Sequence, residues 1–197
     1  MKKKAVFIDR DGVINELVYH TEMGIVDSPF TVEQFKLLPS VGKAINKFHD
    51  LDFLVILISN QPGQAKNHYS IEVFKKIKEK MKKELEKDKA KIDAEYYCFH
   101  HPDAKNKKYK KICNCRKPKP GMILQAAKDY DVDLSKSWMI GDGINDIQAG
   151  EKAGCKTILI GIMKCDFCKI MEDVSVKPNF VAPNLYKASL VIEKEVR

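Results

Sequence analysis

Short runs of apolar, strand-forming residues alternate along this chain with longer amphipathic segments, and this alternation restricts its possible folds. We expect strands at residues 5–8, 53–59, 94–99, 137–140 and 157–160. We expect helices at residues 41–50, 71–87, 121–130 and 146–153, and a last helix at 185–195 that Asn184 caps. Apolar strands that alternate with helices are typical of a parallel sheet covered on both faces. The sequence therefore predicts an α/β fold in one domain, residues 1–197.

Length and composition fit a globular protein rather than a disordered or membrane-spanning one. The chain has 197 residues, of which 44% are hydrophobic and 31% charged. Its longest apolar stretch, residues 53–58, is too short to span a bilayer. The basic start is followed by an apolar run that ends at Asp9, which does not resemble a signal peptide. We expect a cytoplasmic monomer that contacts no membrane.

The net charge of +8 raises the question of nucleic-acid binding. Much of this charge lies in residues 75–91, where Lys alternates with acidic residues around Ile77, Met81 and Leu85. Such spacing is typical of an amphipathic helix with a solvated outer face. A small anionic substrate would also suit a basic protein. We expect no nucleic-acid partner, and a zinc-stabilised nucleic-acid-binding module is kept as the alternative from a different functional class.

Polar groups follow the predicted strands where a parallel sheet would bring them together. Three groups directly follow strands: Asp9 and Asp11, Ser59-Asn60-Gln61, and Asp142 with Asp146. A fourth group, Arg116-Lys117, precedes a helix. The carboxyl ends of parallel strands share one edge of the sheet, and ligands bind there. We expect these groups to form one site.

Each group suits one requirement of phosphoryl transfer. One carboxylate of the pair Asp9 and Asp11 can attack phosphorus while the other moves a proton. Ser59 can donate to a phosphoryl oxygen, and Lys117 can neutralise the developing charge. Asp142 adds an oxygen ligand for Mg²⁺. Any one of these residues could belong to a turn or a helix cap, but their joint order favours a phosphatase.

This set of motifs resembles that of the haloacid dehalogenase (HAD) superfamily, whose four motifs would span nearly the whole chain. The resemblance implies a Rossmann-like HAD fold in which Asp9 forms an aspartyl-phosphate and Asp11 is the general acid and base. It implies that Ser59 and Lys117 bind the transferring phosphoryl group. By the same resemblance, Mg²⁺ would be held by Asp9, the main-chain carbonyl of Asp11, and Asp142. Asp146 would orient Lys117 or a metal-bound water.

A second group of residues has the spacing of a structural zinc site. The pattern C-x-H followed by C-x-C is formed by Cys98, His100, Cys113 and Cys115. Three thiolates and one imidazole make a closed tetrahedral set for Zn²⁺. Because Cys115 directly precedes Arg116-Lys117, the zinc would fix the backbone that presents both cations to the substrate. The lone C-x-x-C of Cys165 and Cys168 is more typical of free thiols, and its role stays open.

The zinc pattern narrows the resemblance to the small, capless D,D-heptose 1,7-bisphosphate phosphatases. It implies removal of the 7-phosphate of D-glycero-D-manno-heptose 1,7-bisphosphate, with Arg116 on the retained part of the substrate. Ser59, Asn60 and Gln61 would line the phosphate pocket. Two departures from that family are residues 62–67, which replace S-G-I-A-R-G, and Gly143, which replaces a frequent Lys. Histidinol phosphate or another small sugar phosphate is therefore the alternative substrate.

Overall fold

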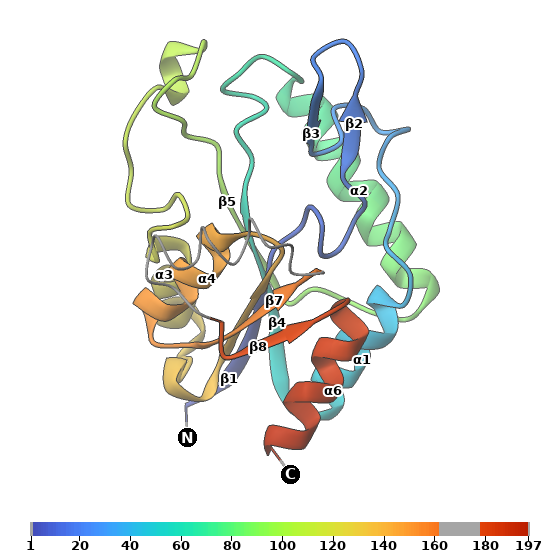
Figure 1. Ribbon diagram of the computed structural model, residues 1–197, viewed down its shortest axis with the longest axis vertical. Coiled ribbons are helices and arrows are strands. Elements are labelled where there is room, and N and C mark those ends of the chain that lie inside the picture. Colours follow the sequence, from blue (N-terminus) through green and yellow to red (C-terminus); the bar gives the residue numbers. More distant parts are fainter. Residues whose placement is uncertain (1, 162–177, 197) are drawn as a thin grey trace.

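A computed structural model describes residues 2–161 and 178–196 of the chain (Figure 1). Its main sheet has six parallel strands in the order β5-β4-β1-β6-β7-β8. Their bounds are β1 Lys4–Ile8, β4 Phe53–Asn60, β5 Ala94–Cys98, β6 Trp138–Gly141, β7 Lys156–Ile160 and β8 Phe180–Ala182. The predicted parallel sheet is confirmed.

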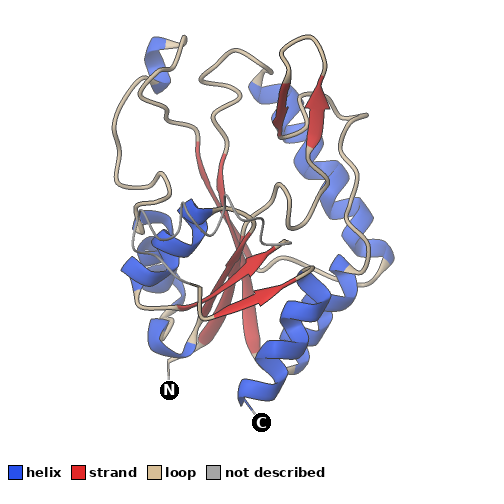
Figure 2. Cartoon of the chain, in the orientation of Figure 1, coloured by secondary structure: helices blue, strands red, loops and turns tan. Residues whose placement is uncertain are grey.

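Helices cover both faces of this sheet, which gives three layers (Figure 2). One face packs against α1 Val41–Asp50, α2 Ile71–Lys87 and α6 Leu185–Val196. The other packs against α3 Gly121–Tyr130 and α4 Ile144–Ala153. The expected bounds of α1, α2 and α3 agree with the structure, and Asn184 Oδ1 accepts a hydrogen bond from Lys187 N at the start of α6.

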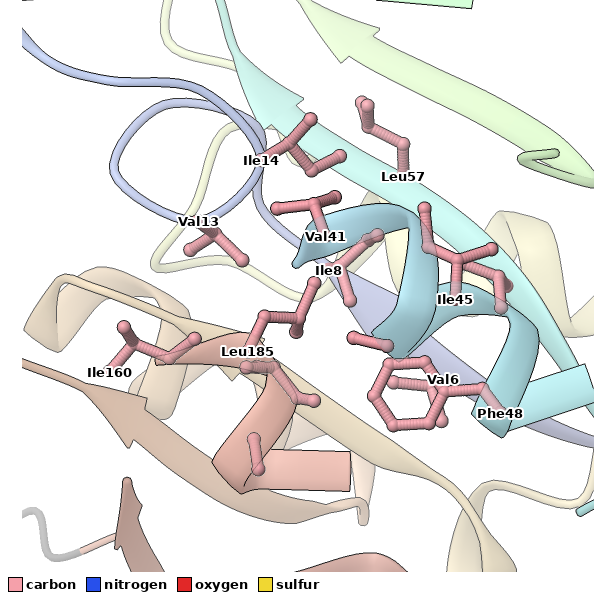
Figure 3. Packing of buried hydrophobic residues seen from close by; sticks show 14 of the residues in the cluster. Val6, Ile8, Val13, Ile14, Val41, Ile45, Phe48, Leu57, Ile160 and Leu185 are labelled. Atoms are coloured by element: carbon pink, nitrogen blue, oxygen red, sulfur yellow. The ribbon is translucent and has the colours of Figure 1, made fainter. Parts of the chain in front are cut away.

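Successive side chains of β1 point to opposite faces of the sheet, so the core is divided into two clusters, one on each face. Val6 and Ile8 of β1 join the cluster formed with α1, α2 and α6, whereas Ala5 and Phe7 join the cluster with α3 and α4. All four side chains are fully buried. Figure 3 shows the first cluster, in which side chains of β1, α1 and α6 meet. A strand buried on both faces is the reason why these runs are continuously apolar.

Three short strands were not expected from the sequence. The connection after β1 contains the hairpin of β2 Val18–His20 and β3 Ile25–Asp27, and β8 extends the sheet beyond β7. Each has only three residues, too few for alternation to be visible. Short 3₁₀ turns, η1 Lys107–Tyr109 and η2 Leu134–Lys136, interrupt two other connections. Cys165 and Cys168 lie outside the described residues.

The long connections lie beyond the carboxyl ends of the strands (Figure 1). Strand order reverses between β1 and β6, because the chain first adds β4 and β5 on one side and then β6, β7 and β8 on the other. Such a switch point is where open α/β sheets bind ligands. Over residues 2–161 and 178–196 no cap domain covers this edge, and no helix is long and apolar enough to cross a membrane.

Candidate active site

Asp9 lies at the switch point, one residue beyond the end of β1. Its main-chain N–H donates to Ile140 O of β6 over 3.0 Å, which fixes the backbone between the two strands. Its Oδ1 accepts from Arg10 N at 2.7 Å and from Lys117 Nζ at 2.9 Å. Burial raises the pKa of Asp9 to about 6 even though Lys117 opposes the shift. The carboxylate is therefore held in one orientation in a site largely shielded from water.

Lys117 links the two sides of the site. Its buried ammonium group lies 2.9 Å from Asp9 Oδ1, 2.5 Å from Asp146 Oδ1 and 2.9 Å from Ile58 O, to which it donates. Burial opposes its charge, but Asp146 and Asp9 outweigh burial and raise the pKa of Lys117. Asn60 fixes the Lys117 backbone, donating to Lys117 O and accepting from Lys117 N, each over 3.1 Å. The cation is charged and positioned by hydrogen bonds at both ends.

Asp11 is held by three neighbouring side chains. Arg10 donates to Oδ1 through Nε at 3.1 Å and through Nη2 at 3.0 Å, and Nη2 also reaches Oδ2 at 3.2 Å. Asn15 Nδ2 donates to Oδ1 over 3.0 Å, and Gln61 Nε2 donates to Oδ2 over 2.6 Å. Arg10, Asn15 and Gln61 are each at most 1% exposed. A carboxylate with this many fixed donors has little freedom to rotate.

Three carboxylates meet where Mg²⁺ was expected. Oxygen atoms of Asp9, Asp142 and Asp146 lie within 4.8 Å of one another, and hard oxygen donors are the ligands that Mg²⁺ prefers. Asp146 Oδ2 accepts from Gly143 N at 3.1 Å while Oδ1 faces Lys117, which suits the expected orienting role of Asp146. Burial, followed by the charges of Asp9 and Asp146, raises the pKa of Asp142 to about 8. Because the ionised forms of these carboxylates repel one another, a bound cation would stabilise their arrangement.

Gly12 makes this approach possible. Its φ is +76°, in the left-handed region that L side chains disfavour. A Cβ at Gly12 would lie 2.1 Å from Asp142 Oδ2. The loop after β1 and the loop after β6 can therefore touch only because residue 12 has no side chain.

The predicted zinc ligands also come together. The three sulfur–sulfur distances among Cys98, Cys113 and Cys115 are 3.2, 3.3 and 3.5 Å. His100 Nδ1 lies 3.4 Å from Cys115 Sγ and 3.7 Å from Cys98 Sγ. A tetrahedral site with Zn–S bonds of about 2.3 Å has ligand separations of about 3.8 Å. The set fits Zn²⁺ with slight expansion, and its four positions are all filled by protein atoms.

Comparison with known proteins places this geometry in a family. Residues 114–188 match the model of the HAD-hydrolase-like family. The D-glycero-β-D-manno-heptose-1,7-bisphosphate 7-phosphatase of Haemophilus ducreyi is 39% identical over 80% of this chain and 82% of its own. The chain belongs to the HAD-like phosphatases.

A further relative and a solved structure support the same family assignment. The D-glycero-α-D-manno-heptose-1,7-bisphosphate 7-phosphatase of Burkholderia mallei is 39% identical over 81% of this chain and 80% of its own. A solved D,D-heptose 1,7-bisphosphate phosphatase from B. bronchiseptica, with magnesium and phosphate, superposes with a TM-score of 0.78 at 29% identity. That likeness covers 98% of this chain and 99% of the other. The interpretation as a phosphoric monoester hydrolase is confirmed.

Several residues of the phosphatase have contacts that the sequence did not indicate. Asn60 and Gln61, expected to line the phosphate pocket, use their amides to hold Lys117 and Asp11. Ser59 is 1% exposed, and its Oγ accepts from Gln61 Nε2 at 3.0 Å. Arg116, expected on the retained part of the substrate, donates to the main-chain oxygen of His100, one of the predicted zinc ligands, over 3.4 Å.

Sequence reasoning missed two residues that hold Asp11. Arg10 occupies the variable position of the D-x-D pair, where no charge is required, and its burial could not be seen in the sequence. Asn15 stands four residues after Asp11, and this spacing alone does not reveal a contact. The structure shows that Arg10 is buried and pairs with the adjacent Asp11 carboxylate.

Proposed function

We propose that this chain is a Mg²⁺-dependent phosphatase that removes the 7-phosphate of D-glycero-D-manno-heptose 1,7-bisphosphate through a phosphoryl group carried on Asp9. The observation that carries the proposal is the meeting of Asp9, Lys117 and Asp142 at the switch point of the sheet. The Lys117–Asp9 ion pair and the approach of Asp9 to Asp142 support their assignment as fixed cation, nucleophile and metal ligand. Phosphoryl transfer depends mainly on such positioning and charge stabilisation.

In the first half of the reaction, a carboxylate oxygen of Asp9 attacks the phosphorus of the substrate. The bond between phosphorus and the sugar oxygen breaks, and Asp11 gives its proton to that oxygen as it leaves. Lys117 and the hydroxyl of Ser59 bind phosphoryl oxygens as their charge grows. Release of the sugar leaves a phosphoryl group on Asp9 and an ionised Asp11.

In the second half, Asp11 removes a proton from water as the water attacks the phosphoryl group on Asp9. The bond between Asp9 and phosphorus breaks, inorganic phosphate forms, and both carboxylates return to their starting states. Mg²⁺, when held by Asp9, Asp142 and the main-chain carbonyl of Asp11, supplies positive charge that offsets repulsion between the phosphate and these carboxylates. Asp146 keeps Lys117 aligned throughout.

The heptose substrate is proposed from the relatives at 39% identity, which are named 7-phosphatases for the β and the α form of this bisphosphate. The proposed zinc site supports the same substrate, because it orders the segment that leads into Arg116. The Arg116 side chain is half-buried beside His100, at the end of that segment, where it would contact the part of the sugar that is retained. We propose that residues 1–197 act as one catalytic unit and as a monomer in the cytoplasm.

A phosphate-release panel tests this proposal. The purified chain is assayed with Mg²⁺ on both anomers of the heptose bisphosphate, on histidinol phosphate and on common sugar phosphates. We expect kcat/KM for one heptose anomer to exceed that for the other substrates by at least about tenfold, and Asp9→Asn to abolish release. Comparable slow turnover of every substrate would reject the heptose assignment. Release that survives Asp9→Asn would reject the proposed nucleophile.

A further inference from the structure

A chain of buried hydrogen bonds leads from Tyr69 through Gln61 to Asp11. Tyr69, in the connection between β4 and α2, donates from its hydroxyl to Gln61 Oε1 over 2.8 Å. Gln61 Nε2 in turn donates to Asp11 Oδ2 over 2.6 Å and to Ser59 Oγ over 3.0 Å. Tyr69 is 8% exposed and Gln61 is fully buried. Neither side chain has solvent as an alternative partner.

The position of the Tyr69 ring is itself restricted. A Cβ on Gly63 would lie 2.1 Å from the ring, so the ring packs directly on the Gly63 backbone. Phe30 lies 6.0 Å from the Tyr69 ring and stacks on His20 at 3.7 Å. Packing therefore holds the hydroxyl at one point beside Gln61.

A glutamine amide has two ends of nearly equal shape and opposite hydrogen-bonding character. With Nε2 toward Asp11 the amide attracts the carboxylate, and with Oε1 toward it the amide repels it. Burial raises the pKa of the Tyr69 phenol well above its usual range, so the phenol keeps its proton and can donate to Oε1. Donation from Tyr69 favours the first orientation of the amide.

We propose that Tyr69 is a positioning residue for Asp11, acting through Gln61: its hydroxyl fixes the amide so that Nε2 holds the Asp11 carboxylate in place for proton transfer. Among the described residues, no hydrogen bond or ring contact joins Tyr69 to Asp9, Asp142 or Lys117. The inference rests on the proposed role of Asp11 as general acid. It extends the site to the loop that precedes α2 and to the hairpin that follows β1.

The test uses the leaving group of the substrate as the readout. Proton donation matters for a sugar alkoxide, whereas p-nitrophenolate leaves readily without it. We expect Tyr69→Phe to lower kcat/KM for the heptose bisphosphate by about tenfold or more, mainly through kcat, and to change kcat/KM for p-nitrophenyl phosphate less than about twofold. Tyr96→Phe is the matched control, because it removes a tyrosine hydroxyl bonded to Asp129 at 2.6 Å, away from the site, and should alter neither value.

A second variant separates positioning from folding. Gln61→Met keeps the volume but removes both amide groups, so it should show the same leaving-group selectivity, and the double variant should lose no more than Gln61→Met alone. Equal losses on both phosphates, or additive losses in the double variant, would overturn the inference. If the unmodified protein does not cleave heptose bisphosphate, the proposed substrate fails instead. The Tyr69→Phe comparison with p-nitrophenyl phosphate is then made with the alkyl phosphate that the phosphate-release panel identifies as the best substrate.

Discussion

Replacing Gly12 with alanine tests the contact between the loops after β1 and β6. The new Cβ would lie 2.1 Å from Asp142 Oδ2, so the carboxylate must move by about 1 Å to reach an allowed separation of about 3 Å. A misplacement of about 1 Å can cost about 100-fold in rate. We therefore expect Gly12→Ala to lower kcat about 100-fold and to raise the Mg²⁺ concentration needed for half-maximal activity.

Gly24→Ala is the matched control for backbone strain. Gly24 has φ of +63°, close to the +76° of Gly12, but nothing lies within 4 Å of its Cβ position. The left-handed conformation costs an alanine about 1–2 kcal/mol. For a chain of this size, that corresponds to a fall in Tm of about 2–8 °C. Both variants should show this fall, because the Asp142 side chain can move aside at little further cost to stability.

The two variants are compared by thermal unfolding and by Mg²⁺ titration of phosphate release from p-nitrophenyl phosphate. Gly24→Ala should keep the kcat and the Mg²⁺ requirement of the unmodified protein. If Gly12→Ala kept both as well, Asp142 would not be needed where it lies. If Gly24→Ala lost as much activity as Gly12→Ala, backbone strain alone would explain the loss.

Other predictions concern the two proposed metal sites and Lys117. Without metal, burial raises the pKa of Asp9 to about 6 and of Asp142 to about 8, from 3.8, so between about pH 4 and pH 8 the folded protein holds protons that the unfolded chain has released. Its stability should fall as pH rises through this window. At one fixed Mg²⁺ concentration the rise in Tm should be larger at pH 8 than at pH 6, because fewer protons compete for the carboxylates at pH 8. Where that concentration is about 100 times the Kd, Mg²⁺ adds about 2.7 kcal/mol. A rise in Tm independent of pH would contradict this. Cys113→Ser should lower both zinc content and kcat, whereas Cys155→Ser, outside the ligand set, should keep both. Full activity without bound zinc would reject the proposed structural role of zinc. Asn60→Ala removes both hydrogen bonds to the buried Lys117 backbone and should lower kcat about tenfold. It should also lower Tm by several degrees, because buried backbone groups lose their partners at a cost of about 1–3 kcal/mol each. An unchanged kcat would show that Lys117 needs no such support.

Sequence patterns predicted the elements that bury a regular face. Helix α2 has Ile77, Met81 and Leu85 on its buried side, and a period of this kind is visible without a structure. Strand β8 was missed because Phe180–Ala182 is three residues long at the edge of the sheet. Local sequence alone could not separate it from a loop.

The candidate site could be predicted where the chemistry lies in the motifs themselves. Asp9 and Asp142 follow strands whose carboxyl ends must meet, so their convergence follows from the topology. Lys117 lies in the connection from β5 to α3, just before the helix, and this connection leaves the same edge of the sheet. The hydrogen bonds from Tyr69 and Gln61 depend instead on how two loops pack, and no spacing reveals such packing. Tertiary contacts between irregular segments are therefore what the structure contributes.

Trapping the phosphoryl group on the enzyme tests the central claim most directly. Acid quenching during turnover of a substrate with a radiolabelled phosphate traps the label on the protein. Borohydride then reduces the acyl phosphate to an alcohol and releases the labelled phosphate, and peptide mass mapping identifies the reduced residue. We expect the trapped label to be released by borohydride, the reduced residue to be Asp9, and Asp9→Asn to give neither label nor turnover. Label on another residue, or turnover by Asp9→Asn, would contradict it.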